Sequence, residues 1–319
     1  MVGSVVRDPG HCARLDSVPA PALNSAIVAQ ESAPDFTLVA GATLAALLRQ
    51  APLPALETRI LASHALALTR VQLITQSERP LSAAEAQRLE NLIQRRLAGE
   101  PIAYLVGERE FFGLSFIVTP AVLIPRPDTE LLVELALERL PHAGRLVDLG
   151  TGSGAIAVAI AHQRPDARVT ALDASAEALA IAQQNAGRNQ ASVTFLQSDW
   201  YAGLGNECFD VVASNPPYIE KGDPHLAQGD LRFEPANALT DHADGLSDLR
   251  TIVSGASQHL AVGGWLLMEH GYDQAQAVRS MLAAQGFNQV QSWRDLAGIE
   301  RVSGGTAPRD LTASVPANP

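Results

Sequence analysis

The alternation of short apolar runs with longer helical runs constrains this chain more than any other feature. Between residues 145 and 303 the hydrophobic period changes repeatedly from that of a strand to that of a helix. Such alternation is typical of an α/β fold, a doubly wound sheet of mainly parallel strands. Ligands bind such sheets beyond the carboxyl ends of the strands. Strands are predicted at 145–149, 169–172, 193–196, 209–213, 265–268, 290–293 and 300–303, and helices at 155–163, 176–189 and 273–285.

A glycine-rich loop follows the first of these strands and precedes a helix. It contains Gly150, Gly152 and Gly154, with Thr151 and Ser153 between them. Without side chains at the glycines, the loop can bend sharply and a ligand can approach the backbone closely. The spacing is Gly-x-Gly-x-Gly, whereas dinucleotide enzymes carry Gly-x-Gly-x-x-Gly, so the loop favours another cofactor over that of a dehydrogenase.

Acidic and aromatic residues lie at the ends of the neighbouring strands. Asp148 precedes the glycine loop and can orient it, and Asp173 lies about where such folds bind ribose hydroxyls. Asp199 can accept a hydrogen bond from an adenine amino group, and Trp200 can stack on the ring. Acidic residues at strand ends are common, and a tryptophan here also suits the core. In this context, the residues together predict an adenosine-containing cofactor.

The segment Asn215-Pro216-Pro217-Tyr218 follows the strand at 209–213. An amide or aromatic amino nitrogen is a poor nucleophile because its lone pair is delocalised, so a catalyst of methyl transfer to it must hold the NH2 group. The Asn215 side-chain oxygen and the Pro216 carbonyl can accept its two hydrogens. The prolines fix their φ angles, and Tyr218 can lie against a planar acceptor. We therefore predict Asn215, Pro216 and Tyr218 as catalytic and all four residues as substrate-binding, with no strong general base. The competing interpretation is an ordinary turn.

Before residue 145 the sequence predicts a helical domain at 36–104 and a hairpin linker at 105–122, with Gly113 at its turn. A capping box, Ser82 to Glu85, begins one helix. His64 lies on an apolar helix stripe with Leu56, where we expect it to be packed. The helical domain is either a scaffold or a docking surface for a macromolecular substrate. Residues 1–35 are predicted to be a disordered extension, 123–306 a catalytic domain and 307–319 a loose tail.

Charge and composition exclude several classes of protein. The net charge of −11 argues against nonspecific binding to a phosphate backbone. Two distant cysteines and eight histidines without ligand spacing predict neither a disulfide framework nor a metal site. The start of the chain lacks the apolar core of a signal peptide, and no run is long enough to span a bilayer. We expect a monomeric cytoplasmic protein that contacts neither membrane nor nucleic acid directly.

Six motifs occur in order: 107–111 (Gly-Glu-Arg-Glu-Phe), 124–130 (Ile-Pro-Arg-Pro-Asp-Thr-Glu), 148–154, 215–219, 233–235 and 294–298 (Arg-Asp-Leu-Ala-Gly). Together they resemble the release-factor glutamine methyltransferases of the PrmC/HemK type over residues 37–305. The Asn-Pro-Pro-Tyr motif is shared with adenine-N6 methyltransferases, whereas the 107–130 stretch is more specific. The resemblance implies a seven-stranded Rossmann-like methyltransferase domain, a small N-terminal helical domain and a β-hairpin linker. Asp128 stands where the family often has Glu, and Trp200 where Phe also occurs.

The resemblance also implies the site and the substrate. Residues 150–154, Asp173 and Trp200 would bind S-adenosylmethionine, Asn215 would contact both cofactor and glutamine, and residues 216–218 would frame the substrate. Methyl transfer would then reach the N5 nitrogen of the glutamine in the Gly-Gly-Gln motif of class 1 peptide chain release factors. The competing hypotheses are an enzyme that methylates a flipped or captured base and a noncatalytic partner of the translation machinery.

Two further features of the catalytic domain suggest roles at the site. Glu234-Pro235 and residues 241–245 lie in the long connection after Tyr218 and are predicted to form a lid. Arg126 would face either the cofactor's carboxylate or a buried ion-pair partner.

Overall fold

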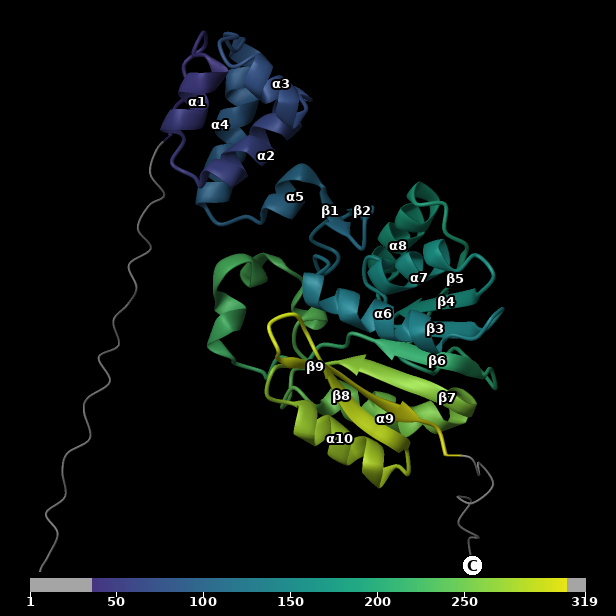
Figure 1. Ribbon diagram of the computed structural model, residues 1–319. Coiled ribbons are helices and arrows are strands. Elements are labelled where there is room, and N and C mark those ends of the chain that lie inside the picture. Colours follow the sequence, from purple (N-terminus) through teal and green to yellow (C-terminus); the bar gives the residue numbers. More distant parts are fainter. Residues whose placement is uncertain (1–35, 309–319) are drawn as a thin grey trace, which may run out of the picture. The chain divides into compact units, whose positions relative to one another are not determined.

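The computed structural model describes residues 36–308 (Figure 1). The extension predicted at 1–35 and residues 309–319 of the predicted tail lie outside the described residues. Ala307 is buried, and its N–H donates to the Gly264 carbonyl. The first five helices are α1 (Leu44–Gln50), α2 (Ala55–Leu66), α3 (Arg70–Thr75), α4 (Ala83–Leu97) and α5 (Ile102–Val106).

These helices enclose a core of their own, in which Leu47, Leu61 and Leu89 are fully buried. The capping box predicted at Ser82 is present, because its hydroxyl accepts from the Glu85 N–H while Glu85 accepts from the Ser82 N–H. A second capping box, which the sequence analysis missed, begins α3 at Thr69.

The prediction for the buried face of α2 was partly wrong. His64 is exposed, and Leu56 keeps 61% of its surface in solvent. The buried residues of α2 are Thr58, Leu61 and Ala62. Thr58 can replace an apolar residue there because its hydroxyl donates to the Pro54 carbonyl, so no polar atom is left unpaired.

A two-stranded antiparallel hairpin links the helices to the rest of the chain, as predicted. It consists of β1 (Glu108–Phe111) and β2 (Leu114–Ile117). Gly113 has a φ of +74°, a left-handed conformation that glycine adopts without steric cost. Phe111 and Phe116 pack edge to face, 5.9 Å apart, and join the core of the following domain.

The remaining strands form one seven-stranded sheet in the order β5-β4-β3-β6-β7-β9-β8, which confirms the predicted fold class. Strands β3 to β7 pair in parallel, and β9 is antiparallel to both of its neighbours. The strands are β3 (Arg145–Leu149), β4 (Arg168–Asp173), β5 (Val193–Gln197), β6 (Phe209–Ser214), β7 (Leu260–Glu269), β8 (Asn288–Arg294) and β9 (Glu300–Thr306).

Helices cover both faces of this sheet (Figure 1). One face packs against α6 and α7 through an apolar core that includes Leu132 and Ile160, and the other packs against α9 and α10 through Ile252 and Val278. This two-sided burial accounts for the apolar sequences of the central strands. The helices of this domain are α6 (Glu130–Arg139), α7 (Ala155–Gln163), α8 (Ala176–Arg188), α9 (Ser247–His259) and α10 (Ala275–Ala284), with short 3-10 turns η1 (Pro127–Thr129), η2 (Pro224–Ala227), η3 (Gly229–Phe233) and η4 (Ala236–Ala238).

Helix α9 was not predicted from the sequence. Its sequence, Ser-Asp-Leu-Arg-Thr-Ile-Val-Ser-Gly-Ala-Ser-Gln-His, is rich in weak helix formers. The weakest helix former among them is Gly255. Tertiary packing requires glycine there, because a Cβ on Gly255 would stand 2.5 Å from the ring of Tyr201. Burial of Leu249, Ile252 and Val253 therefore stabilises a helix that local propensity does not predict.

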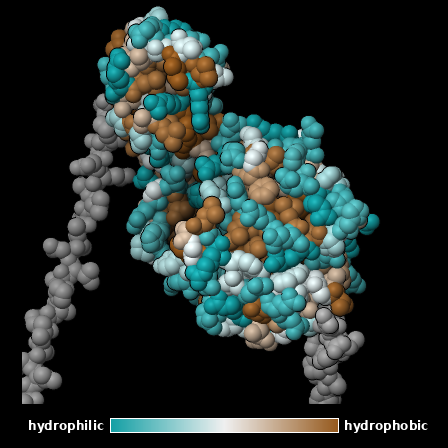
Figure 2. All heavy atoms as spheres, viewed as in Figure 1, coloured by the Kyte–Doolittle hydropathy of each residue, from teal (hydrophilic) through white to brown (hydrophobic). Residues whose placement is uncertain are grey.

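Hydrophobic side chains also gather on the surface of the helical domain (Figure 2). Leu56, Val71 and Ile74 are 61%, 67% and 75% exposed there. A cavity of about 970 Å³ lies between α1, α2, α3 and α5. Its lining is mainly apolar and also includes Arg59, Ser63, His64, Arg70, Ser77 and Glu108. Within residues 36–308, no helix has the length and apolar character needed to cross a membrane.

Candidate active site

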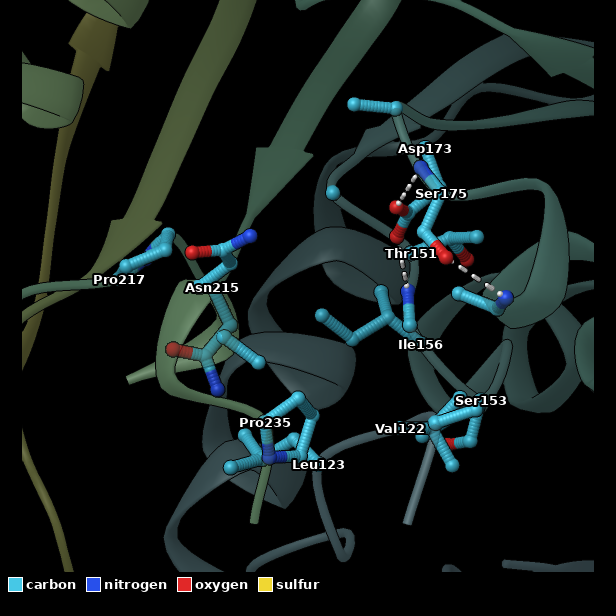
Figure 3. Close-up of a pocket in the computed structure, with 18 of the residues that line it drawn as sticks. Val122, Leu123, Thr151, Ser153, Ile156, Asp173, Ser175, Asn215, Pro217 and Pro235 are labelled. Atoms are coloured by element: carbon cyan, nitrogen blue, oxygen red, sulfur yellow. Dashed lines mark hydrogen bonds between the residues drawn. The ribbon is translucent and has the colours of Figure 1, made fainter. Parts of the chain in front are cut away.

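A cavity of about 630 Å³ lies at the carboxyl ends of β3, β4, β5 and β6. We call it the carboxyl-end cavity. In Figure 3, Asn215 and Pro217 lie on one side of it, and Thr151, Asp173 and Ser175 on the other. Of the residues predicted from sequence, the lining includes Gly150, Thr151, Gly152, Ser153, Asp173, Asp199, Trp200, Asn215 and Pro217; Gly154, Pro216 and Tyr218 are not among the lining residues.

The glycine loop needs glycine for its backbone conformation. Gly150, Gly152 and Gly154 have φ angles of +71°, +55° and +84°, which L side chains rarely adopt. Gly154 also begins α7, where a Cβ would approach Ala182 to 3.1 Å. Gly154 thus has a packing role beneath the cavity, whereas Gly150 and Gly152 lie at its surface.

Asp173 ties this loop to the next strand. One carboxylate oxygen accepts from the Gly152 N–H at 2.8 Å, and the other accepts from the Ser175 N–H at 2.9 Å. Burial raises the pKa of Asp173, and these backbone hydrogen bonds oppose that rise. Each oxygen keeps a further lone pair, so the carboxylate can also accept from hydroxyl groups in the cavity.

Asp148 lies beneath the loop and is completely buried. Its Oδ2 accepts from the Thr151 hydroxyl at 2.6 Å and from the Ala157 N–H at 3.3 Å. Its Oδ1 has no partner among the described residues. Burial raises the pKa of Asp148 to about 7. The carboxyl group therefore holds the loop from below.

Asp199 and Trp200 form the third side of the carboxyl-end cavity. Asp199 is exposed, and Trp200 is half-buried with a left-handed φ of +45°. The indole ring lies against the glycine loop, because a Cβ on Gly150 would meet it at 3.5 Å. The ring also packs on the apolar core beneath the sheet. The two interpretations of Trp200 are thus compatible, since one face of a ring can pack while another part lines a cavity.

Asn215 directly follows β6 and reaches toward η1. Its Nδ2 donates to the Thr129 hydroxyl at 3.2 Å. Because an amide has one donor end and one acceptor end, this hydrogen bond leaves Oδ1 as the end available to a ligand. Pro217 shares the cavity wall, whereas the Tyr218 hydroxyl donates away from it to Glu269 at 3.2 Å. In this structure Tyr218 supports the segment from behind rather than facing the cavity.

An ion pair joins two distant segments of the cavity wall. Arg126 lines the cavity and pairs with Glu234, whose side chain is fully buried. Glu234 also accepts from the Ile124 N–H at 3.0 Å, which anchors the loop that carries Pro235. Arg126 therefore has the buried partner that the sequence analysis considered, while it keeps a place at the cavity.

Several lining residues were not predicted as site residues. The motif at 124–130 contained Pro125 and Thr129, so this signal was present but had not been assigned a role. Asn237 and Asp248 carried no signal, because they reach the cavity only through folding of the long connection. The unpredicted lining residues include Val122, Leu123, Pro125, Thr129, Ile156, Ser175, Asn237, Ala238 and Asp248.

The chemistry of these residues fits an adenosine-containing cofactor. The cavity volume is in the range that small-molecule sites occupy. Asp173 offers carboxylate oxygens for ribose hydroxyls, and the flat face of Trp200 stands beside the glycine loop. Within residues 36–308, no cluster of three or more His, Cys, Asp or Glu side chains is arranged to hold a metal ion.

Comparison with known protein families matches two parts of the chain. Residues 127–241 match the family described as methyltransferase small domain, and residues 42–107 match the PrmC N-terminal domain. A crystal structure of a methyltransferase from Pyrococcus furiosus aligns with a TM-score of 0.48 and 21% identity, covering 68% of this chain and 97% of that one.

Several relatives that align over most of their own length bear one name, release factor glutamine methyltransferase. A release factor glutamine methyltransferase from Burkholderia pseudomallei is 58% identical over 276 residues, covering 84% of this chain and 97% of the relative. Those from Neisseria gonorrhoeae and Escherichia coli are 53% and 44% identical, covering 81% and 78% of this chain and 96% and 91% of the relatives. On this similarity, the chain belongs to the release factor glutamine methyltransferase family.

Proposed function

We propose that this protein transfers a methyl group from S-adenosylmethionine to the N5 amide nitrogen of the glutamine in the Gly-Gly-Gln motif of class 1 peptide chain release factors. The names of its relatives support the reaction and the kind of substrate. Methylation of that glutamine would modulate translation termination. The single structural observation that carries the proposal is the orientation of the Asn215 amide. Its nitrogen donates to Thr129, so its oxygen is left to accept a hydrogen bond from the NH2 group of the substrate.

S-adenosylmethionine supplies an electrophilic methyl group on a positively charged sulfur. In the transfer, a nitrogen–carbon bond forms as the carbon–sulfur bond breaks, the sulfur becomes neutral, and the nitrogen subsequently gives up one proton. Asn215 Oδ1 and the Pro216 carbonyl would accept the two hydrogens of the substrate amide. This orients the nitrogen lone pair and stabilises the positive charge that develops on nitrogen.

The same pair of acceptors accounts for selection of glutamine. A glutamate side chain has no N–H donors, so both acceptors would be left without partners in a closed site. Leaving buried acceptors unpaired is costly, which makes hydrogen-bonding sites strongly selective against analogues that lack the donor.

The cofactor would occupy the side of the cavity opposite Pro217. We propose that the loop at 150–154 cradles it, with Thr151 and Ser153 at the surface and Gly154 fixing the start of α7. Asp173 would accept from the ribose hydroxyls, and Asp199 and Trp200 would contact the adenine. Asn215 would lie between cofactor and substrate.

The helical domain at 36–104 would dock the protein substrate. Its exposed apolar residues and its cavity of about 970 Å³ support this role, because large apolar patches mark interaction sites. The hairpin linker at 105–122 would join it to the catalytic domain at 123–306. We further propose a monomer that acts in the cytoplasm and binds no nucleic acid directly.

The test is transfer of labelled methyl groups to three acceptors: purified release factor, its Gln→Glu variant in the Gly-Gly-Gln motif, and total cellular RNA. We expect label on the unaltered factor alone. Label on RNA with none on the factor would overturn the proposal and favour a base methyltransferase instead.

A further inference from the structure

Glu269 is a buried acid that the reaction described above does not use. It is the last residue of β7 and is 1% exposed. Strands β6 and β7 pair in parallel, with Ser214 opposite Met268, so Asn215 and Glu269 leave adjacent strands at the same edge of the sheet. The acid therefore lies directly behind the proposed acceptor site.

A chain of polar side chains connects Glu269 to both ends of the Asn215–Tyr218 segment. At one end, the Tyr218 hydroxyl donates to Glu269 Oε1 at 3.2 Å. At the other end, Asn215 Nδ2 donates to the Thr129 hydroxyl at 3.2 Å. Thr129 lowers the pKa of Glu269 against the effect of burial, although no direct hydrogen bond joins these two described residues in the structure. Glu269 Oε2 is buried and has no hydrogen-bond partner among the described residues.

The hydrogen-bond capacity of the Thr129 hydroxyl links the charge of Glu269 to the orientation of Asn215. A hydroxyl has one hydrogen to donate and two lone pairs with which to accept. When that hydrogen points to the Glu269 carboxylate, the oxygen can only accept from Asn215, so the amide nitrogen stays on Thr129 and Oδ1 faces the cavity. When Glu269 itself carries a proton and donates to Thr129, the hydroxyl hydrogen is free to turn toward Asn215. The amide can then reverse and present NH2 to a substrate that also presents NH2.

We propose that Glu269 is a positioning residue which, through Thr129, fixes the Asn215 amide with its oxygen toward the substrate and, through Tyr218, holds the far end of the same segment. The inference rests on the proposed function, because it assigns Asn215 the role of hydrogen-bond acceptor. It extends that function by making correct positioning depend on the ionisation of Glu269.

The surroundings of Glu269 place this ionisation near neutrality. Burial raises its pKa to about 7, the Thr129 and Tyr218 hydroxyls oppose the rise, Asp128 adds to it and Arg301 opposes it. The carboxylate that positions Asn215 is therefore present above about pH 7 and is lost as the pH falls. The other charged or titratable groups near these elements are Arg126, which with Arg301 acts on Tyr218, and His270, whose pKa is lowered by burial. Glu300, Arg301 and Arg279 also influence the pKa of His270.

The main test compares wild type with Glu269→Gln over a pH range that spans the pKa of Glu269, by steady-state methylation of release factor. The introduced glutamine would donate an N–H to Thr129 as protonated Glu269 does. We expect kcat to fall by about tenfold to hundredfold, the size of loss that a small misplacement produces. The acid limb of the wild-type kcat profile should disappear in the variant, while the affinity for S-adenosylmethionine, measured by calorimetry, stays within about twofold. An identical acid limb in both proteins would overturn the inference.

Substitutions of Thr129 test the route while leaving the Glu269 side chain in place. Thr129→Val removes the hydroxyl at nearly constant volume, whereas Thr129→Ser keeps it. We expect the valine variant to lose kcat as Glu269→Gln does and the serine variant to retain most of it. The Thr129→Val, Glu269→Gln double variant should lose no more than the worse single variant, because both changes interrupt one chain. Losses that multiply would show two independent structural effects and would also overturn the inference.

A spectroscopic readout separates this inference from the identity of the substrate. The side-chain amide signal of Asn215 can be assigned by nuclear magnetic resonance from its absence in Asn215→Ala. In wild type it should shift with a midpoint near the pKa of Glu269, and in Glu269→Gln it should not shift. If release factor is not methylated but the signal titrates in this way, the proposed substrate fails and the positioning role stands. If methylation proceeds and the signal does not titrate, the positioning role fails alone.

Discussion

The two sides of the carboxyl-end cavity each rest on a buried carboxyl group, Asp148 beneath the glycine loop and Glu269 beneath the Asn215 segment. The two residues are 0% and 1% exposed, and burial raises the pKa of each to about 7. Each also keeps one carboxyl oxygen without a hydrogen-bond partner among the described residues. Asp148 and Glu269 are therefore nearly alike in their burial, in the direction of their pKa shifts and in their hydrogen bonding.

They differ in where their partners lie along the chain. Asp148 binds Thr151 and Ala157, which are three and nine residues away. Glu269 accepts from the hydroxyl of Tyr218, which is 51 residues away. In the proposal above it acts on Asn215 through Thr129, which comes from yet another segment. The support of the glycine loop by Asp148 is thus local, whereas the acceptor side is assembled from three segments that only the folded sheet brings together. We therefore expect damage around Asp148 to weaken cofactor binding and damage around Glu269 to slow the transfer.

The largest expected effect is that of Asn215→Ala, on the acceptor side. Loss of one preorganised hydrogen-bonding group typically costs about 10²- to 10³-fold in kcat. We expect a loss of that size in transfer to release factor, with binding of S-adenosylmethionine largely kept, because Asp173 and the glycine loop remain. Asn206→Ala, at an exposed position before β6, is a matched control that should leave both unchanged. Equal losses of cofactor affinity and turnover in Asn215→Ala would remove the distinction between the two sides.

Asp173→Ala should have the next largest effect, on the cofactor side. The change removes the acceptor of the Gly152 and Ser175 N–H groups together with the proposed ribose contact. Hydrogen bonds to a charged group contribute about 1.5–3 kcal/mol, so we expect the Kd for S-adenosylmethionine to rise about tenfold to hundredfold. Calorimetry measures the Kd directly. At saturating cofactor, kcat should recover; a large loss of kcat that persists there would show that the two sides are not separable.

The third expected effect concerns stability and leaves the separation of the two sides untouched. The pKa of Asp148 rises from 3.8 to about 7 on folding, so the folded protein keeps a proton that the unfolded chain releases. Its stabilising contribution is therefore complete below the unfolded pKa and is lost as the pH rises through the folded one. Asp148→Asn should reduce this decline by up to about 1.4 kcal/mol per pH unit between those values.

Denaturant unfolding at several pH values measures this effect, and Glu134→Gln, on the exposed side of α6, is the control. Glu269→Gln should reduce the decline in stability in the same way, but only Glu269→Gln should also remove the acid limb of kcat. If Asp148→Asn left the pH dependence of stability unchanged, the pKa of Asp148 would not be raised in the folded protein. Asp148 and Glu269 would then differ in their ionisation.

The amino-acid sequence by itself determined the features that rest on neighbouring residues. These features are the alternation of strands and helices along the chain, the glycine loop, the hairpin turn at Gly113 and the capping box at Ser82. They follow from local backbone conformation and hydrogen bonding. Asp148 and Asp173 could be placed at the cofactor side for the same reason, because they directly end the strands that frame the loop.

Only the tertiary structure decided the rest. It formed α9 from weak helix formers, because its apolar face is buried against the sheet, and it left His64 exposed although its spacing suggested burial. It also brought Thr129 to Asn215 and Tyr218 to Glu269, because β7 pairs with β6 and the two strands end at the same edge of the sheet. Strand order and the packing of distant segments depend on contacts between residues far apart in the chain, and no local pattern records them.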